Sequence, residues 1–145
     1  MKNYVTWLRT AFIAQLITAL IHAITLFGTL PANNDTEKQL LTLMDTYQFD
    51  LGSGYHRTMG ELLLVLSSCF SLVCLLGGLL NWYLLREKVE LRVMKGVVTI
   101  NLIVFGTGFI LTVTFAFLPP IIMMGSIVLS LLLSRFTIPK TVDKF

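Results

Sequence analysis

Four long stretches of the chain carry almost no charged side chains, and short polar segments separate them. The clearest stretch runs from Leu62 to Leu85 without a single charge. A helix rises about 1.5 Å per residue, so a run of this length can cross a hydrocarbon layer of about 30 Å. The pattern predicts an all-α protein, a four-helix transmembrane bundle that forms one domain over residues 1–145. We expect the helices at about residues 7–30, 58–86, 94–118 and 120–137.

The first apolar stretch follows Lys2 and Arg9 and ends before Pro31, so its charge pattern also fits a signal peptide. Its apolar core is too long for a typical signal peptide, and it contains Gln15 and His22. We therefore interpret the stretch as a helix that is retained in the protein.

The largest polar segment lies between the first two helices and predicts a short amphipathic helix at about residues 35–48. Asn34 and Glu37 have the spacing of a helix start at which side chains bind the free backbone N–H groups. Thr36 and Gln39 offer the same spacing as an alternative. Apolar residues then recur on one face of the segment, which suits a helix lying on the membrane surface or over the helix ends.

A turn is expected between this segment and the second long helix. Gly52 and Gly54 supply the backbone freedom that a turn back into the membrane requires. Thr58 then stands three residues before Glu61, which again predicts a capped helix start.

Lysine and arginine are distributed unequally among the polar segments. Most of them flank the chain ends and the connector between the second and third helices: Lys2, Arg9, Arg86, Lys88, Arg92, Lys95, Arg135, Lys140 and Lys144. Only Lys38 and Arg57 lie between the first two helices. By the positive-inside rule, both the N and C termini are cytoplasmic and the amphipathic segment faces outward. The net charge is +3, but the basic residues flank the apolar runs and form no basic patch. We therefore expect no nucleic-acid partner.

Polar residues inside a membrane are costly and are therefore candidates for function. We expect an outward-facing polar pocket beneath the amphipathic segment. Its candidate residues are His22, Asp50, Tyr55, His56, Arg57 and Glu61. A hydrogen bond or ion pair between His22 and Glu61 is geometrically plausible. The alternative is that His22 bonds a neighbouring helix and Glu61 only caps its own helix.

A second polar pair is expected nearer the cytoplasmic side. Gln15 and Asn101 lie at similar distances inside the boundaries of the first and third helices. They can therefore meet at equal depth and form a hydrogen bond across the two helices, which stabilises packing in a membrane by about 1 kcal/mol or less.

Metal or haem binding has little support in the sequence. His22 and His56 are the only two histidines, and in principle they could be the axial ligands of a haem b. There is no Cys-x-x-Cys-His motif, and two imidazoles are too few for a typical zinc site. We expect no metal site and no cofactor.

One stretch of the chain resembles a known group of proteins. It comprises Asp50-Leu51-Gly52, His56-Arg57-Thr58 and Glu61, followed by a serine-rich helix that ends Gly78-Leu79-Leu80-Asn81. The stretch resembles uncharacterised small bacterial membrane proteins with four predicted helices. The resemblance implies no function. We expect a multi-pass integral protein of the bacterial inner (cytoplasmic) membrane.

The sequence contains no recognisable catalytic set, which favours a non-enzymatic membrane protein. We expect either an accessory subunit of a membrane complex or a binder of a hydrophobic small molecule or lipid at the outward pocket. One alternative is an enzyme acting on a lipid or quinone, with a histidine and Glu61 as acid and base. A further alternative is a small oligomeric transporter. The expected partners are membrane lipids, together with a larger membrane protein or further copies of the chain.

Overall fold

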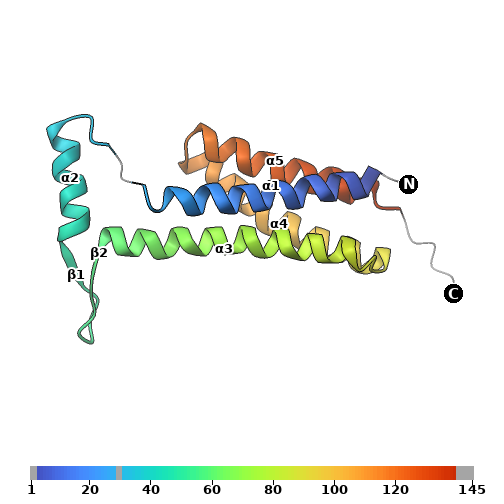
Figure 1. The fold of residues 1–145 in the computed structure, drawn as a ribbon, viewed down its shortest axis with the longest axis horizontal. Coiled ribbons are helices and arrows are strands. Elements are labelled where there is room, and N and C mark those ends of the chain that lie inside the picture. The colour runs from blue at the N-terminus through green and yellow to red at the C-terminus, as the bar shows by residue number, and fades with distance from the viewer. Residues whose placement is uncertain (1–2, 29–30, 140–145) are drawn as a thin grey trace. The chain divides into compact units, whose positions relative to one another are not determined.

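The computed structural model describes residues 3–28 and 31–139 of the chain. Four of its helices are long and apolar enough to cross a membrane: α1 (Asn3–Thr25), α3 (Met59–Arg86), α4 (Leu91–Phe115) and α5 (Leu118–Thr137). The chain between α1 and α3 contains a shorter helix, α2 (Asp35–Thr46), and two strands, β1 (Gln48–Asp50) and β2 (His56–Thr58) (Figure 1). The four predicted long helices are present. The two strands were not predicted.

The helix ends differ from the prediction by a few residues, and local chemistry explains two of the differences. The last residue of α1 is Thr25, whose hydroxyl donates a hydrogen bond to the carbonyl oxygen of His22 (2.7 Å). Pro119 and Pro120 lie in the first turn of α5, where a backbone N–H has no helical partner to lose. The prolines therefore open α5, and α4 ends before them at Phe115.

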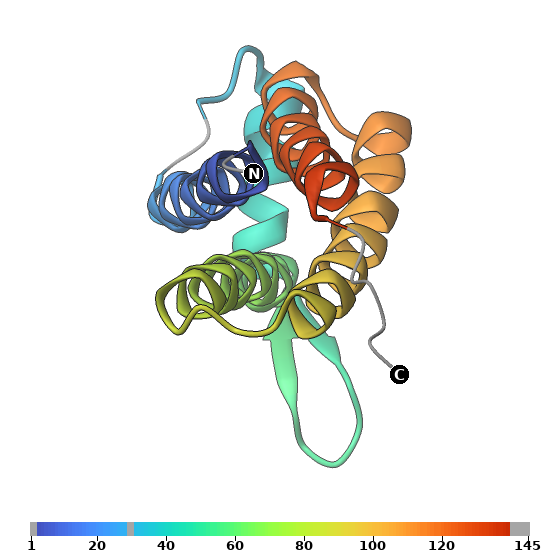
Figure 2. The ribbon, with the colours of Figure 1, turned by 90° about the vertical axis from the view of Figure 1, so that its right-hand side faces the viewer.

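The chain divides into two compact units. One comprises Met1–Ala19 and Val73–Phe145, and we call it the four-helix unit; the other, Leu20–Leu72, we call the hairpin unit. Within the four-helix unit, Figure 2 shows the helices nearly end on, in the order α1, α5, α4, α3 around a common interior.

The core of the four-helix unit is formed by residues that recur every three or four positions on each helix. They include Leu8, Ala11, Gln15 and Thr18 of α1, Cys74, Asn81 and Leu84 of α3, Met94, Val98, Asn101 and Phe105 of α4, and Met124, Ile127, Leu131 and Ser134 of α5. This spacing keeps one stripe of each helix turned inward. The remaining surface of the helices is apolar and exposed, as a helix facing lipid requires.

Small residues allow α4 and α5 to pack closely. A Cβ atom at Gly108 would lie 2.9 Å from the Cε atom of Met124, and one at Gly125 would lie 3.2 Å from the Cε2 atom of Phe109. Side chains from the opposite helix thus occupy the space beside each glycine. Close approach through small residues is the usual way in which helices pack where lipid removes the hydrophobic drive between them.

In the hairpin unit, α2 begins with the predicted cap at Asn34. The N–H of Glu37 donates to Asn34 Oδ1 (2.8 Å), and the N–H of Asn33 donates to Glu37 Oε2 (2.7 Å). The hydrogen bonds from Asn33 lower the pKa of the Glu37 carboxyl below its ordinary value of 4.5, because they favour the charged form. The alternative start at Thr36 and Gln39 is not used.

The chain leaves α2 through a two-stranded antiparallel hairpin, in which Phe49 of β1 pairs with Arg57 of β2. Its turn has positive φ angles at Gly52 (+81°) and Gly54 (+80°), which glycine adopts without steric cost. The carboxylate of Asp50 accepts a hydrogen bond from the N–H of Gly52 (2.8 Å). The turn follows the prediction, and the strands extend it by three residues on each side.

Candidate functional site

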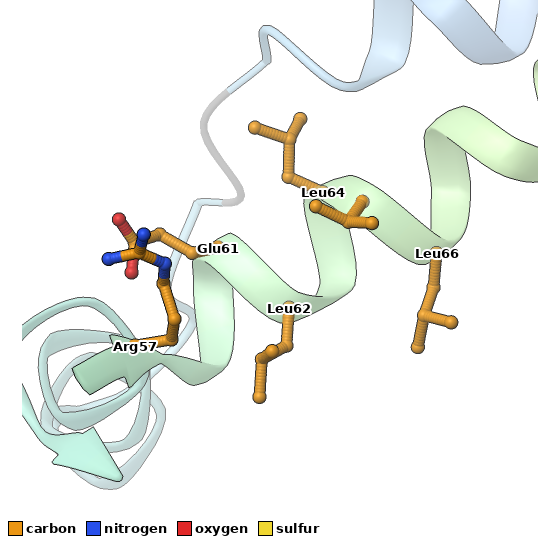
Figure 3. Close-up of a pocket in the computed structure, with 6 residues that line it drawn as sticks. Arg57, Glu61, Leu62, Leu64 and Leu66 are labelled. Atoms are coloured by element: carbon orange, nitrogen blue, oxygen red, sulfur yellow. The ribbon is translucent and has the colours of Figure 1, made fainter. Parts of the chain in front are cut away.

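An open groove of about 610 Å³ lies at the start of α3. It is lined by Arg57, Glu61, Leu62, Leu64, Val65 and Leu66. In Figure 3, the charged groups of Arg57 and Glu61 lie at one end, and the leucine side chains follow along the helix, with Leu64 on one side and Leu62 and Leu66 on the other. The groove therefore combines a charged end with apolar side chains, which we call its apolar wall, that extend about 7 Å along the helix from Glu61 to Leu66 on more than one side of it.

The carboxylate of Glu61 is held in place by the predicted helix cap. Its Oε2 atom accepts a hydrogen bond from the N–H of Thr58 (2.9 Å), and Thr58 Oγ1 accepts one from the N–H of Glu61 (3.2 Å). The predicted cap between Thr58 and Glu61 is therefore present. Its second oxygen, Oε1, has no hydrogen-bond partner within residues 3–28 and 31–139, so it remains available to a ligand.

Arg57 is positioned by β2. Its Nη1 atom donates to the carbonyl oxygen of His56 (2.9 Å), which leaves the other guanidinium N–H groups without a partner in the described part of the chain. Although Glu61 is nearby in the sequence, no ion pair joins it to Arg57 among the described residues. Both side chains are exposed, so the groove presents one unpaired positive and one unpaired negative group.

A second carboxylate, that of Asp45, lies beside this end of α3. A Cβ atom at Gly60 would lie 2.7 Å from Asp45 Oδ1 and 3.6 Å from the carbonyl oxygen of Met44, so the end of α2 packs against the first turn of α3. Asp45 therefore adds negative charge beside the end of the groove that Arg57 and Glu61 line.

His22 does not reach Glu61. Its ring packs edge-on against Phe70, with the ring centroids 4.9 Å apart. Phe70 follows Glu61 by nine residues, which is about 13 Å of helix rise. The imidazole also forms no hydrogen bond with any described residue. The contact between His22 and Glu61, which the sequence left open beside the alternative, is absent from the described residues.

The other predicted pocket residues, Asp50, Tyr55 and His56, lie on the hairpin and are exposed. Asp50 stabilises the turn through Gly52. The backbone of Tyr55 closes the turn, since its N–H donates to the carbonyl oxygen of Gly52 (3.0 Å). None of the three lines the groove, which takes only Arg57 and Glu61 from the predicted set.

The two histidines are not brought together. His56 precedes the first residue of α3, Met59, whereas His22 lies beside Phe70. The helix rises about 16 Å between Met59 and Phe70, and two axial ligands must approach the same haem iron. Within the described residues, no group of three or more His, Cys, Asp or Glu side chains could hold a metal ion.

In the four-helix unit, Gln15 bonds Asn81 rather than Asn101. The Nδ2 group of Asn81 donates to Gln15 Oε1 (2.9 Å), and both residues are fully buried. The amide of Asn101 instead donates to the carbonyl oxygen of Val97 in its own helix (3.1 Å). This corrects the expected partner of Gln15. In the described chain, Gln15 Nε2 and Asn81 Oδ1 have no hydrogen-bond partner.

Sequence reasoning missed Asn81 and the four apolar residues of the groove. Asn81 follows Cys74 by seven residues, which is the spacing of one helix face, and this could have placed it in the core. Leu62 and Leu66 lie in a run in which every position is apolar, so no pattern marks them. No protein-family model, no curated protein and no solved structure matches this chain.

Proposed function

We propose that this chain is a multi-pass integral membrane protein that binds a lipid, or another hydrophobic small molecule with a polar end, in the groove at the start of α3. The four long apolar helices support the membrane location. The observation that supports the binding function is the groove itself, in which the apolar side chains of residues 62 and 64–66 adjoin two exposed charged groups. A lipid has the same division into an apolar chain and a polar head.

The location of the groove along α3 also favours a lipid. Arg57 and Glu61 stand at the boundary where the polar hairpin ends and the apolar helix begins. In a membrane, that boundary lies at the level of lipid headgroups. We further propose that this end of the molecule faces outward in a bacterial inner membrane, with both termini in the cytoplasm, because the lysine and arginine residues concentrate on the other side.

The groove volume is within the range of about 300–1,000 Å³ that is typical of small-molecule sites. The groove differs from an enclosed site because Val65 and Leu66 remain largely exposed. An occupant would therefore keep one side in contact with surrounding lipid. Such a site suits a resident membrane lipid better than a water-soluble ligand.

Native mass spectrometry in a mild detergent tests the proposal. The purified protein is expected to carry a bound lipid that survives gentle ionisation. Val65→Trp should reduce the bound fraction, because the larger side chain fills the groove. Val73→Trp is the matched control, since Val73 is an exposed valine farther along the same helix and outside the groove. A ligand-free wild-type protein, or equal retention by the two variants, would contradict the proposal.

The same measurement addresses the other possible functions. A larger protein that stays bound at a fixed ratio would favour an accessory subunit, and a ring of identical chains would favour an oligomeric transporter. An enzyme that uses His22 and Glu61 has no support from their positions, because the two side chains are not in contact.

A further inference from the structure

The charges at the polar end of the groove indicate which kind of lipid it accepts. This inference rests on the proposed lipid-binding function. We propose that the groove selects a lipid whose headgroup carries both a phosphate and a primary ammonium, with the phosphate bound by Arg57 and the ammonium bound by Glu61.

The first observation is that both charged groups have free hydrogen-bonding capacity. Arg57 uses Nη1 for the carbonyl oxygen of His56, and its other N–H groups have no partner in the residues that the structure describes. Glu61 uses Oε2 in the helix cap, and its Oε1 atom has no hydrogen-bond partner among the described residues. A guanidinium offers donors that suit phosphate oxygens, and a carboxylate oxygen accepts from an ammonium N–H.

The second observation is that both groups are positioned by the protein before any ligand arrives. Arg57 is held by its bond to the strand backbone and by the pairing of β2 with β1. Glu61 is held by the reciprocal cap with Thr58. Groups that are already fixed lose less conformational entropy on binding, so their geometry can discriminate between headgroups.

The third observation is the local balance of charge. Among the described residues, Arg57 is the only positive group that lines the groove, and the carboxylate of Asp45 lies beside Gly60, next to Glu61. A headgroup with a net negative charge would meet these two carboxylates and be repelled. A quaternary ammonium would be attracted but has no N–H to donate. A primary ammonium is positively charged and also has N–H groups to donate to a carboxylate.

Binding of three lipids with identical dioleoyl chains tests the proposal: phosphatidylethanolamine, phosphatidylglycerol and phosphatidylcholine. Each is titrated into the delipidated full-length protein in detergent, and bound lipid is counted by native mass spectrometry. The wild type is expected to bind phosphatidylethanolamine about twofold to fivefold more tightly than either of the others, the range for one exposed charged contact.

Two variants then separate the roles of the charges. Glu61→Gln keeps the helix cap, since glutamine also fits that position, but it removes the charge. It should abolish the preference over phosphatidylglycerol. Arg57→Gln should weaken the binding of all three lipids, because each has a phosphate. Glu37→Gln makes the same change in the cap of α2, outside the groove, and should leave the preference unchanged.

The outcomes distinguish this inference from the function on which it rests. Saturable binding that Val65→Trp reduces equally for all three lipids would preserve the lipid-binding function and overturn the headgroup selectivity. No saturable binding of any lipid would overturn both. An unchanged preference in Glu61→Gln would overturn the assigned role of Glu61. Free phosphoethanolamine is expected to compete only weakly, because it lacks the acyl chains that contact the apolar wall.

Discussion

Replacing Gly77 with alanine is expected to destabilise the four-helix unit, although alanine is the better helix former. A Cβ atom at this position would lie 2.7 Å from Gln15 Nε2 and 2.8 Å from the Cε2 atom of Phe105. Contacts shorter than 3.0 Å essentially never occur for real Cβ atoms. Side chains of α1 and α4 must therefore both move away from α3.

The magnitude follows from three contributions. Overpacking of this kind costs about 1–3 kcal/mol. Moving Gln15 also strains its hydrogen bond to Asn81, and such bonds contribute about 0.6 kcal/mol between membrane helices. Against these losses, alanine stabilises the helix relative to glycine by about 1 kcal/mol. The net effect of Gly77→Ala is a loss of about 0.6–2.6 kcal/mol in the free energy of unfolding, by difference of these terms.

Gly106→Ala is the matched control, because a Cβ atom at Gly106 of α4 would have no heavy atom within 4 Å. This variant keeps the gain in helix propensity without the clash, so it should be neutral or slightly stabilising. Reversible unfolding in mixed micelles, followed by the fluorescence of Trp7 and Trp82, measures both variants. If Gly77→Ala proved as stable as Gly106→Ala, α1 and α4 would not pack against α3 as described.

Three further predictions concern other parts of the chain. Gln15→Leu and Asn81→Leu should each cost about 1–3 kcal/mol by leaving the partner amide unpaired, whereas the double variant should cost less than their sum, as unfolding measurements would show. The pKa of Glu37 is lowered in the folded state, so its contribution to α2 is present above pH 4.5 and is lost as the pH falls below that value. The protection of the α2 amides against hydrogen exchange, corrected for the intrinsic exchange rate at each pH, should fall accordingly below pH 4.5, but not in Glu37→Gln. Cysteines placed at Asp45 and Glu90, in a chain without its native cysteines, should react with a membrane-impermeant reagent from opposite sides; labelling from one side would refute the proposed orientation.

The elements that the sequence predicted well are those determined by neighbouring residues. A charge-free run such as Leu62 to Leu85 identifies a long helix without any knowledge of the rest of the fold. The caps at Asn34 and Thr58 depend on residues only three positions apart, and both are present with the expected hydrogen bonds. The strands β1 and β2 are too short to leave an alternating pattern, so only their turn was visible.

The contacts that the sequence could not predict depend on how separate helices are rotated and aligned. Gln15 had two amides available at compatible depths, Asn81 and Asn101, and each residue along a helix turns the side chain by about 100°. Similarly, the sequence allows His22 and Glu61 to meet where α1 ends and α3 begins, but an offset of about two and a half turns places His22 beside Phe70. No pattern along one helix reports its register against another.

The two polar groups in this molecule differ in what they can do. The amides of Gln15 and Asn81 are fully buried among packed side chains, and even a single methyl group at Gly77 would collide with Gln15. A ligand cannot reach them, so their role is to fix the alignment of α1 with α3. Arg57 and Glu61 are exposed, individually held and not paired with each other. Of the polar residues in the described chain, these two therefore remain the strongest candidates for binding a headgroup.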